Sequence, residues 1–186
     1  MNKDIKLSPH FTLGELTKTK YVTADGNIPS RVVIENLIRV CGWLEELRVL
    51  AGVRPQSKVV AGVRPQSKVA GDCTLAPDPG AALDPGAAPS ARKEVPIVIN
   101  SGYRSPEVNR LAGGAANSNH LSGCAVDIRC AGKEQMIRYA SILLDIADGS
   151  KQEYDELLLE QHGSVCWLHF AVRPKENRRI IRFLRV

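Results

Sequence analysis

Apolar residues recur at intervals of three and four along two stretches of the chain. The first stretch spans residues 31–50, and its apolar positions are Val33, Leu37, Val40, Leu44 and Leu47. The second spans residues 133–147, and its apolar positions are Met136, Tyr139, Ile142, Leu143 and Ile146. This spacing predicts two amphipathic helices, each with one side packed on a core.

Shorter apolar runs bounded by turn residues predict strands. Four such runs lie at residues 96–100, 125–130, 154–159 and 166–172, and we expect the first of them to be a buried strand. The polar residues 161–164 between the last two runs predict a hairpin, and Ser105 followed by Pro106 predicts the start of a short helix. The tail, residues 178–186, alternates apolar and basic side chains, which fits an edge strand or a helix. A few helices around a small, mainly antiparallel sheet indicate an α+β fold.

Residues 51–95 follow neither pattern. The sequence AGVRPQSKV at 51–59 is repeated at 61–69, and DPGAA occurs twice between Asp78 and Ala88. A segment of this composition cannot bury enough apolar surface to offset the entropy of ordering. We therefore interpret residues 1–186 as a single domain interrupted at 51–95 by a low-complexity insertion, which we predict to be disordered.

The overall charge and the N-terminal sequence bear on partners and location. The net charge is +5, which suits an anionic partner such as a cell-wall polymer or nucleic acid. No run of eighteen apolar residues is present, so we expect no membrane insertion. The opening MNKDIKLSPHFTLGEL lacks the apolar core and cleavage site of a secretory signal, so we expect synthesis in the cytoplasm.

The five cysteines predict neither a disulfide framework nor a cysteine zinc site. They are odd in number and have no CxxC spacing. We interpret them as reduced thiols, several of them buried, although Cys124 and Cys166 lie close in sequence to the candidate metal ligands discussed next.

Two histidines and one aspartate form a candidate metal set. His120 and Asp127 flank a tight, glycine-containing connection, and His169 lies in the later apolar run. Two imidazoles and a carboxylate are typical of catalytic zinc, because three protein ligands leave a fourth position open for water. The same set occurs in iron(II) oxygenases. The six residues between His120 and Asp127 argue against that alternative, since the oxygenase pair usually has one residue between.

Peptide hydrolysis at such a metal also needs a carboxylate that accepts the proton of water. Glu160 is our candidate, because it ends the strand predicted to pair with the strand of His169. Three weaker candidates are Asp155, Glu156 and His162. Arg104, on the turn after the first predicted strand, could stabilise an oxyanion or bind a substrate carboxylate.

Three motifs together closely resemble peptidase family M15, the zinc D-alanyl-D-alanine peptidases, in the form common in phage endolysins. They are SGYRSPEVN at 101–109, SNHLSGCAVD at 118–127 and WLHF at 167–170. The family pattern is SGYRSxxxN, SxHxxGxAxD and WxH. The segment FTLGEL at 11–16 and the 31–50 helix are also similar, so the resemblance covers most of the chain except residues 51–95.

The resemblance implies a hedgehog/D-Ala-D-Ala-peptidase-like fold and one Zn²⁺ ion held by His120, Asp127 and His169. It implies hydrolysis of peptide bonds in peptidoglycan stem peptides or cross-links. Separately from the resemblance, we expect a monomer with no nucleic-acid partner. Residues matching the family's catalytic and substrate-binding positions, or lying beside them, are Arg104, Tyr103, Ser118 and Trp167. An enzyme of this kind, bacterial or phage in origin, would act on the cell wall after release from the cytoplasm.

The chain departs from the family pattern near the last histidine. Many members have a glutamate three residues before it, where this chain has Cys166, and others have a histidine two residues before it, where this chain has Trp167. Glu160 as the base is therefore our inference from the residues, and a peptidoglycan-binding module that keeps the metal site without turnover is the alternative.

Overall fold

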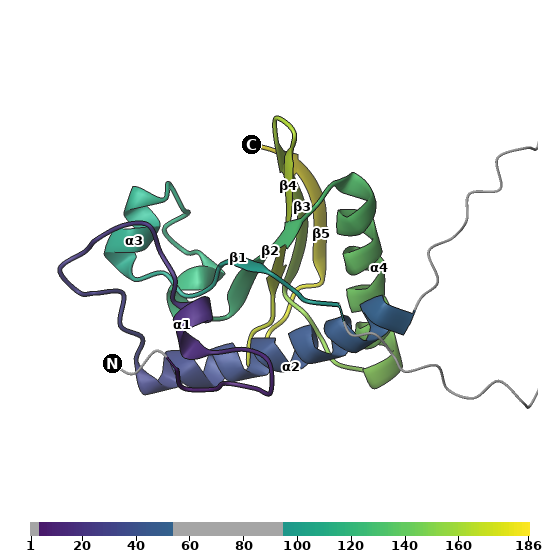
Figure 1. The fold of residues 1–186 in the computed structure, drawn as a ribbon, viewed down its shortest axis with the longest axis horizontal. Helices are drawn as coiled ribbons and strands as arrows, with labels where there is room; N and C mark the ends of the chain where they lie inside the picture. The colour runs from purple at the N-terminus through teal and green to yellow at the C-terminus, as the bar shows by residue number, and fades with distance from the viewer. Residues whose placement is uncertain (1–3, 54–94) are drawn as a thin grey trace, which may run out of the picture.

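The computed structural model describes residues 4–53 and 95–186 (Figure 1). Its helices are α1 (Leu13–Leu16), α2 (Arg31–Val53), α3 (Pro106–Leu111), the short 3-10 helix η1 (Asn119–Ser122) and α4 (Lys133–Ser150). Both long amphipathic helices predicted from the sequence are present, each extended by three residues at its C-terminal end. Most of the insertion predicted at 51–95 lies outside the described residues.

Within residues 4–53 and 95–186, five strands form one sheet in the order β1-β2-β4-β3-β5. They are β1 (Ile99–Ser101), β2 (Ala125–Cys130), β3 (Glu156–His162), β4 (Val165–Ala171) and β5 (Ile180–Arg185). All neighbouring strands are antiparallel except β3 and β5. The chain is therefore α+β with a mainly antiparallel sheet, as the sequence predicts.

The tail forms an edge strand rather than a helix. Strand β5 pairs in parallel with β3, from Glu156 opposite Ile180 to Gln161 opposite Arg185. The parallel direction follows from the path of the chain. Strand β4 ends beside the start of β3, and residues 172–179 carry the chain around that end before β5 begins.

Strand β1 corrects one prediction. The run at 96–100 was expected to be a buried strand, but β1 covers only three residues, and Asn100 is exposed. Val98 is half exposed, at 50%. The reason is position: within the described part of the chain, β1 is the other terminal strand of the sheet and pairs with β2 alone.

The sheet has one covered face. Its buried side chains include Val126, Ile128, Leu157, Leu159, Leu168 and Phe170, which belong to one core cluster with the apolar sides of α2 and α4. Figure 1 shows α4 lying along the sheet and α2 crossing below it. The Trp43 ring of α2 lies 5.2 Å from the Phe170 ring, between centroids. Burial of this face is the main source of stability for the sheet.

The N-terminal segment holds the loop that follows β1. The carbonyl of Leu16 accepts a hydrogen bond from the Tyr103 backbone at 2.7 Å. A Cβ atom at Gly102 would lie 2.3 Å from the same carbonyl oxygen, so only glycine allows this approach. The buried Asn27 side chain donates to the carbonyl of Tyr103 and accepts from the Ser105 backbone. These contacts fix Arg104 between two anchored residues.

Among the helices of the described residues, none has the length and apolar character needed to cross a membrane.

Candidate metal centre

His120 is positioned by the 3-10 helix η1. The Ser118 hydroxyl caps this helix and accepts a hydrogen bond from the His120 backbone at 3.3 Å. Gly123 ends the helix with a φ of +70°, and a Cβ atom there would lie 2.7 Å from Val33 of α2. The His120 Nδ1 atom lies 2.6 Å from the Gly102 carbonyl oxygen. That oxygen can only accept, so Nδ1 carries the proton and Nε2 keeps its lone pair.

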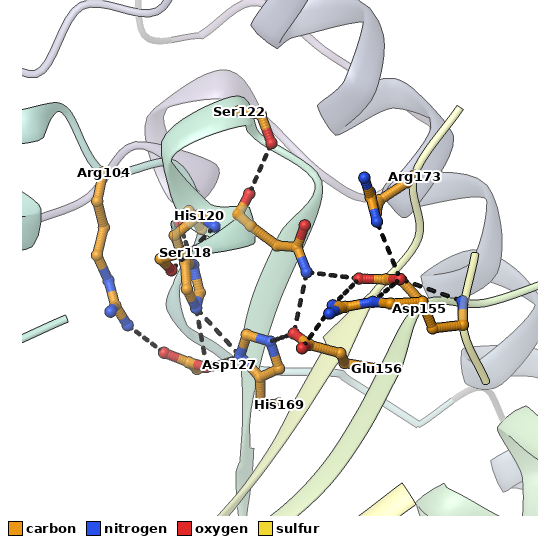
Figure 2. Close-up of polar contacts among 12 residues, drawn as sticks. Arg104, Ser118, His120, Ser122, Asp127, Asp155, Glu156, His169 and Arg173 are labelled. Atoms are coloured by element: carbon orange, nitrogen blue, oxygen red, sulfur yellow. Dashed lines mark hydrogen bonds and ion pairs between the residues drawn. The ribbon is translucent and has the colours of Figure 1, made fainter. Parts of the chain in front are cut away.

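Asp127 and His169 face each other on adjacent strands. They are directly opposite in the β2–β4 register and point to the face of the sheet away from the covered core. His169 Nδ1 lies 3.0 Å from Asp127 Oδ1, and His120 Nε2 lies 3.2 Å from each of these two atoms. All three side chains are buried, and Figure 2 shows them converging.

The three atoms fit a single zinc ion. Ligand atoms about 2.0–2.1 Å from one tetrahedral ion lie about 3.3 Å from one another. The observed separations are 3.0–3.2 Å. Two imidazole nitrogens and a carboxylate oxygen are also the donor set that zinc prefers. The metal-ligand prediction for His120, Asp127 and His169 is therefore compatible with their geometry.

Arg104 holds the second oxygen of Asp127. Its Nη2 atom donates to Asp127 Oδ2, and its Nε atom donates to Ser101 Oγ at 2.8 Å. This leaves Asp127 Oδ1 for the two histidines. Burial acts to raise the pKa of Asp127, but the charges and hydrogen bonds of His120 and His169 outweigh burial and hold the pKa well below its ordinary value.

Glu156 lies behind His169, on the side away from His120 and Asp127 (Figure 2). The buried His169 Nε2 atom has no hydrogen-bond partner among the described residues, and Glu156 Oε2 is 3.5 Å from it. Asn119 donates to the same Glu156 oxygen at 2.9 Å, and Arg178 donates to Oε1 at 2.7 Å. The contacts with His169, and then with Asn119, lower the pKa of Glu156 despite partial burial. Glu156 is thus an ionised carboxylate with its partners in place.

Asp155 anchors the segment after β4. Its carboxylate is fully buried and accepts hydrogen bonds from Arg178 at 2.7 and 2.8 Å and from Asn119 at 2.8 Å. Burial acts to raise its pKa, but these donors and the charge of Arg173 lower it overall. Asp155 therefore ties the segment carrying Arg173 and Arg178 to η1, next to His120.

An open groove of about 820 Å³ lies over the cluster. It is lined by His120, Asp127 and His169, and also by Arg104, Ser118, Glu156, Glu160 and Trp167. Glu160 of β3 lies opposite Trp167 of β4. Leu158, two residues earlier on β3, lies opposite His169. Burial raises the pKa of Glu160, and the negative charge of Asp127 acts in the same direction. Glu160 forms no ion pair with any described residue.

Tyr103 and His162, both named from the sequence, do not line this groove, and neither does Asp155. The Tyr103 side chain is buried in the core cluster, because its backbone is held against Leu16 and Asn27. His162 is exposed at the end of β3, where its Nδ1 atom donates to the Val186 carbonyl at 2.5 Å.

The cysteines near the cluster are not part of it. Cys166 lies opposite Cys130 and is buried on the covered face of the sheet. Cys124 is also buried, and burial raises the pKa of its thiol, the opposite of what a nucleophile needs.

Sequence reasoning missed the polar support around the site. Asn119 lies inside the second motif, yet its role depends on two carboxylates that follow it by more than thirty residues. Sequence analysis likewise did not connect Arg173 and Arg178 with the site. The sequence did contain one signal for these partners, the adjacent acidic residues 155 and 156. Two carboxylates at the start of a buried strand need cationic partners.

Comparison with protein families supports the resemblance seen in the motifs. Residues 86–152 match the family model described as Peptidase M15. The matched segment contains Arg104, His120 and Asp127 and ends before the hairpin that carries His169. Comparison with curated proteins found no match. The match spans the first two motifs of the site, and over this segment the chain is similar to the peptidase M15 family.

Proposed function

We propose that this protein is a zinc metallopeptidase that hydrolyses peptide bonds in the stem peptides or cross-links of bacterial peptidoglycan. The observation that supports it most is the convergence of His120 Nε2, Asp127 Oδ1 and His169 Nδ1 at 3.0–3.2 Å inside an open groove. The M15 family is typically zinc-dependent, which fits this donor set.

A zinc ion held by these three residues would acidify a water molecule and polarise the carbonyl of the bond to be cut. The protein side chains then have separate tasks. Glu160 accepts the proton of the attacking water and delivers it to the leaving amine. Arg104, on the groove wall, places positive charge near the oxyanion that develops on the carbonyl oxygen.

The two glutamates of β3 have different surroundings, and this favours Glu160 as the base. Glu156 is held by Arg178, Asn119 and His169, and its pKa is lowered. Glu160 has a raised pKa and no ion pair in the described part of the chain. A base that must release its proton again needs the higher pKa. Position 166, where relatives have a glutamate, is a cysteine buried on the covered face.

We propose further that the protein acts as a monomer, with neither nucleic acid nor membrane as a partner. Peptidoglycan lies outside the cytoplasmic membrane, so the protein would meet it after release, as a phage endolysin or a bacterial remodelling enzyme does.

The test is digestion of purified peptidoglycan by the zinc-loaded protein, with and without a chelator, followed by mass spectrometry of the released fragments. We expect stem-peptide cleavage that the chelator abolishes and that zinc restores, and the fragment masses identify the bond. Peptidoglycan that stays intact while retaining the protein in a pull-down would contradict the peptidase and support a binding module instead.

A further inference from the structure

A second groove lies beside the metal centre, on the other side of Arg104. It has a volume of about 580 Å³ and is formed by residues 18–21, residues 98–101 around β1, one side of α3, and Arg129 of β2. Arg104 and Ala112 line both this groove and the groove over the metal cluster. A chain lying across the cluster could therefore continue into the second groove.

The lining of the second groove is strongly basic. Lys18, Lys20, Arg104 and Arg129 line it, and no acidic residue does, so we call it the basic groove. Arg104 forms an ion pair with Asp127. Lys18, Lys20 and Arg129 form no ion pair within the described ranges, and Lys20 only approaches the Tyr21 ring, at 5.2 Å from its centroid. The groove over the cluster differs, because Asp127, Glu156 and Glu160 also line it.

Residues 98–101 around β1, at the edge of the sheet, line the basic groove. Among the described residues, β1 pairs with β2 on one side only. Asn100 is exposed, and Val98 offers a half-exposed apolar side chain. An extended peptide can add to such an edge through its backbone, while its side groups meet the flanking residues. Cations without partners at this edge favour an occupant that carries carboxylates.

We propose that the basic groove binds an acidic segment of the substrate peptide, with free carboxylates held by Lys18, Lys20 and Arg129 while the bond to be cut lies over the metal cluster. This inference rests on the proposed peptidase function, because it places the remainder of the same substrate. It adds a preference that the metal centre alone does not supply: peptides with a free carboxylate next to the cleaved region bind better than their amidated forms.

The experiment separates binding from cleavage. Two synthetic stem pentapeptides are compared, one with a free α-carboxylate on its D-glutamate and one with that carboxylate amidated. Each is titrated calorimetrically into the full-length protein treated with chelator, so that metal-dependent cleavage does not occur. If the zinc-loaded protein does not cleave peptidoglycan, the proposed function is contradicted. The titration tests peptide binding in the basic groove independently of cleavage.

We expect the free carboxylate to improve binding by about two- to fivefold at low salt, the usual size of an ion pair at an exposed site. The preference should weaken as salt screens the charges. The double variant Lys18→Gln/Arg129→Gln should lose the preference. Lys175→Gln/Arg185→Gln removes the same charge from exposed residues outside the groove and should keep it. All four residues are exposed, and thermal unfolding checks that the variants stay folded.

Two outcomes would overturn the proposal. Equal binding of both peptides by the unmodified protein is one, and equal loss of preference in the two double variants is the other, since the effect would then come from net charge. A third outcome is that poly(glycerol phosphate) binds more tightly than either peptide and that this binding requires Lys18 and Arg129. The occupant of the groove would then be an anionic wall polymer and not an acidic peptide.

Discussion

The two faces of the sheet differ in what their side chains do. On β4, Leu168 and Phe170 point to the covered face and join the core with α2 and α4, while Trp167 and His169 point to the groove. Strands β2 and β3 alternate in the same way. One face therefore stabilises the sheet, and the other uses that rigid sheet to place metal ligands and carboxylates.

Neighbouring residues of one strand can have different functions, because successive side chains point to opposite faces of the sheet. Substitutions on the groove face should change metal binding or turnover with modest effects on stability. Substitutions on the covered face should do the reverse. Asp155 is the exception, because it is a buried carboxylate at the start of β3 that ties the groove to the scaffold.

The largest effect is expected on the groove face, from His169→Ala. Removing one of three metal ligands should abolish zinc retention and lower turnover by about a thousandfold or more, since the metal supplies several kcal/mol of transition-state stabilisation. Zinc content after dialysis and peptide release measure this. The stability of the His169→Ala variant should be similar to that of the metal-free unmodified protein, so these two proteins are the ones to compare. A variant that keeps both zinc and activity would exclude His169 as a ligand.

Glu160→Gln should lower turnover by about 100- to 10,000-fold, the usual contribution of a general base. Zinc content and thermal stability should not change, because Glu160 forms no ion pair among the residues the structure describes. The matched control is Glu134→Gln, an exposed glutamate at the start of α4. Unaltered turnover in the zinc-loaded Glu160→Gln variant would rule out our choice of base.

On the covered face, Phe170→Ala should reduce the free energy of unfolding by about 3–5 kcal/mol, because a fully buried aromatic ring is replaced by a cavity. Urea unfolding measures the change. Phe170 is next to His169 in the sequence but on the opposite face of the sheet, so the Phe170→Ala and His169→Ala variants compare the two faces directly. A Phe170→Ala protein that remains folded at low temperature should still bind zinc. Loss of zinc binding without loss of stability would contradict the division between the faces.

Glu156→Gln should weaken zinc binding by about 10- to 100-fold, the usual effect of removing the carboxylate behind a histidine ligand. Competition with a chromophoric chelator measures the affinity, and the visible spectrum of the cobalt-substituted protein reports a changed ligand field. A purely structural role would alter stability and leave the spectrum as it is, and that result would argue against Glu156 as a positioning residue.

The smallest effect is a pH dependence at Asp155. Its pKa in the folded protein lies below the ordinary value of 3.8, so its stabilisation is fully present above that value and is lost as the pH falls through the folded pKa. The difference in unfolding free energy between the unmodified protein and Asp155→Asn should therefore narrow below about pH 4. Urea unfolding in chelator gives both values, and a difference that does not change with pH would contradict the assignment.

Local sequence predicted much of the fold. Helical spacing located α2 and α4, and short apolar runs bounded by turn residues located the strands of the hairpin to within a few residues. The tail was ambiguous, because a short alternating segment becomes a strand only if an edge is available, and that depended on the path of residues 172–179. The burial expected for β1 was wrong for a related reason, since burial depends on the number of neighbouring strands.

The sequence by itself determined the identity of the candidate ligands, because their residue types and positions in the motifs can be read from it directly: His120 and Asp127 flank a glycine-containing connection, and His169 lies in a later apolar run. Only the tertiary structure decided which glutamate is free. Glu156 and Glu160 lie on the same face of β3, and their difference comes from Asn119, Arg178 and His169, which reach one of them from three other parts of the chain. A carboxylate's ionisation is set by its neighbours in space, and the local sequence does not specify those neighbours.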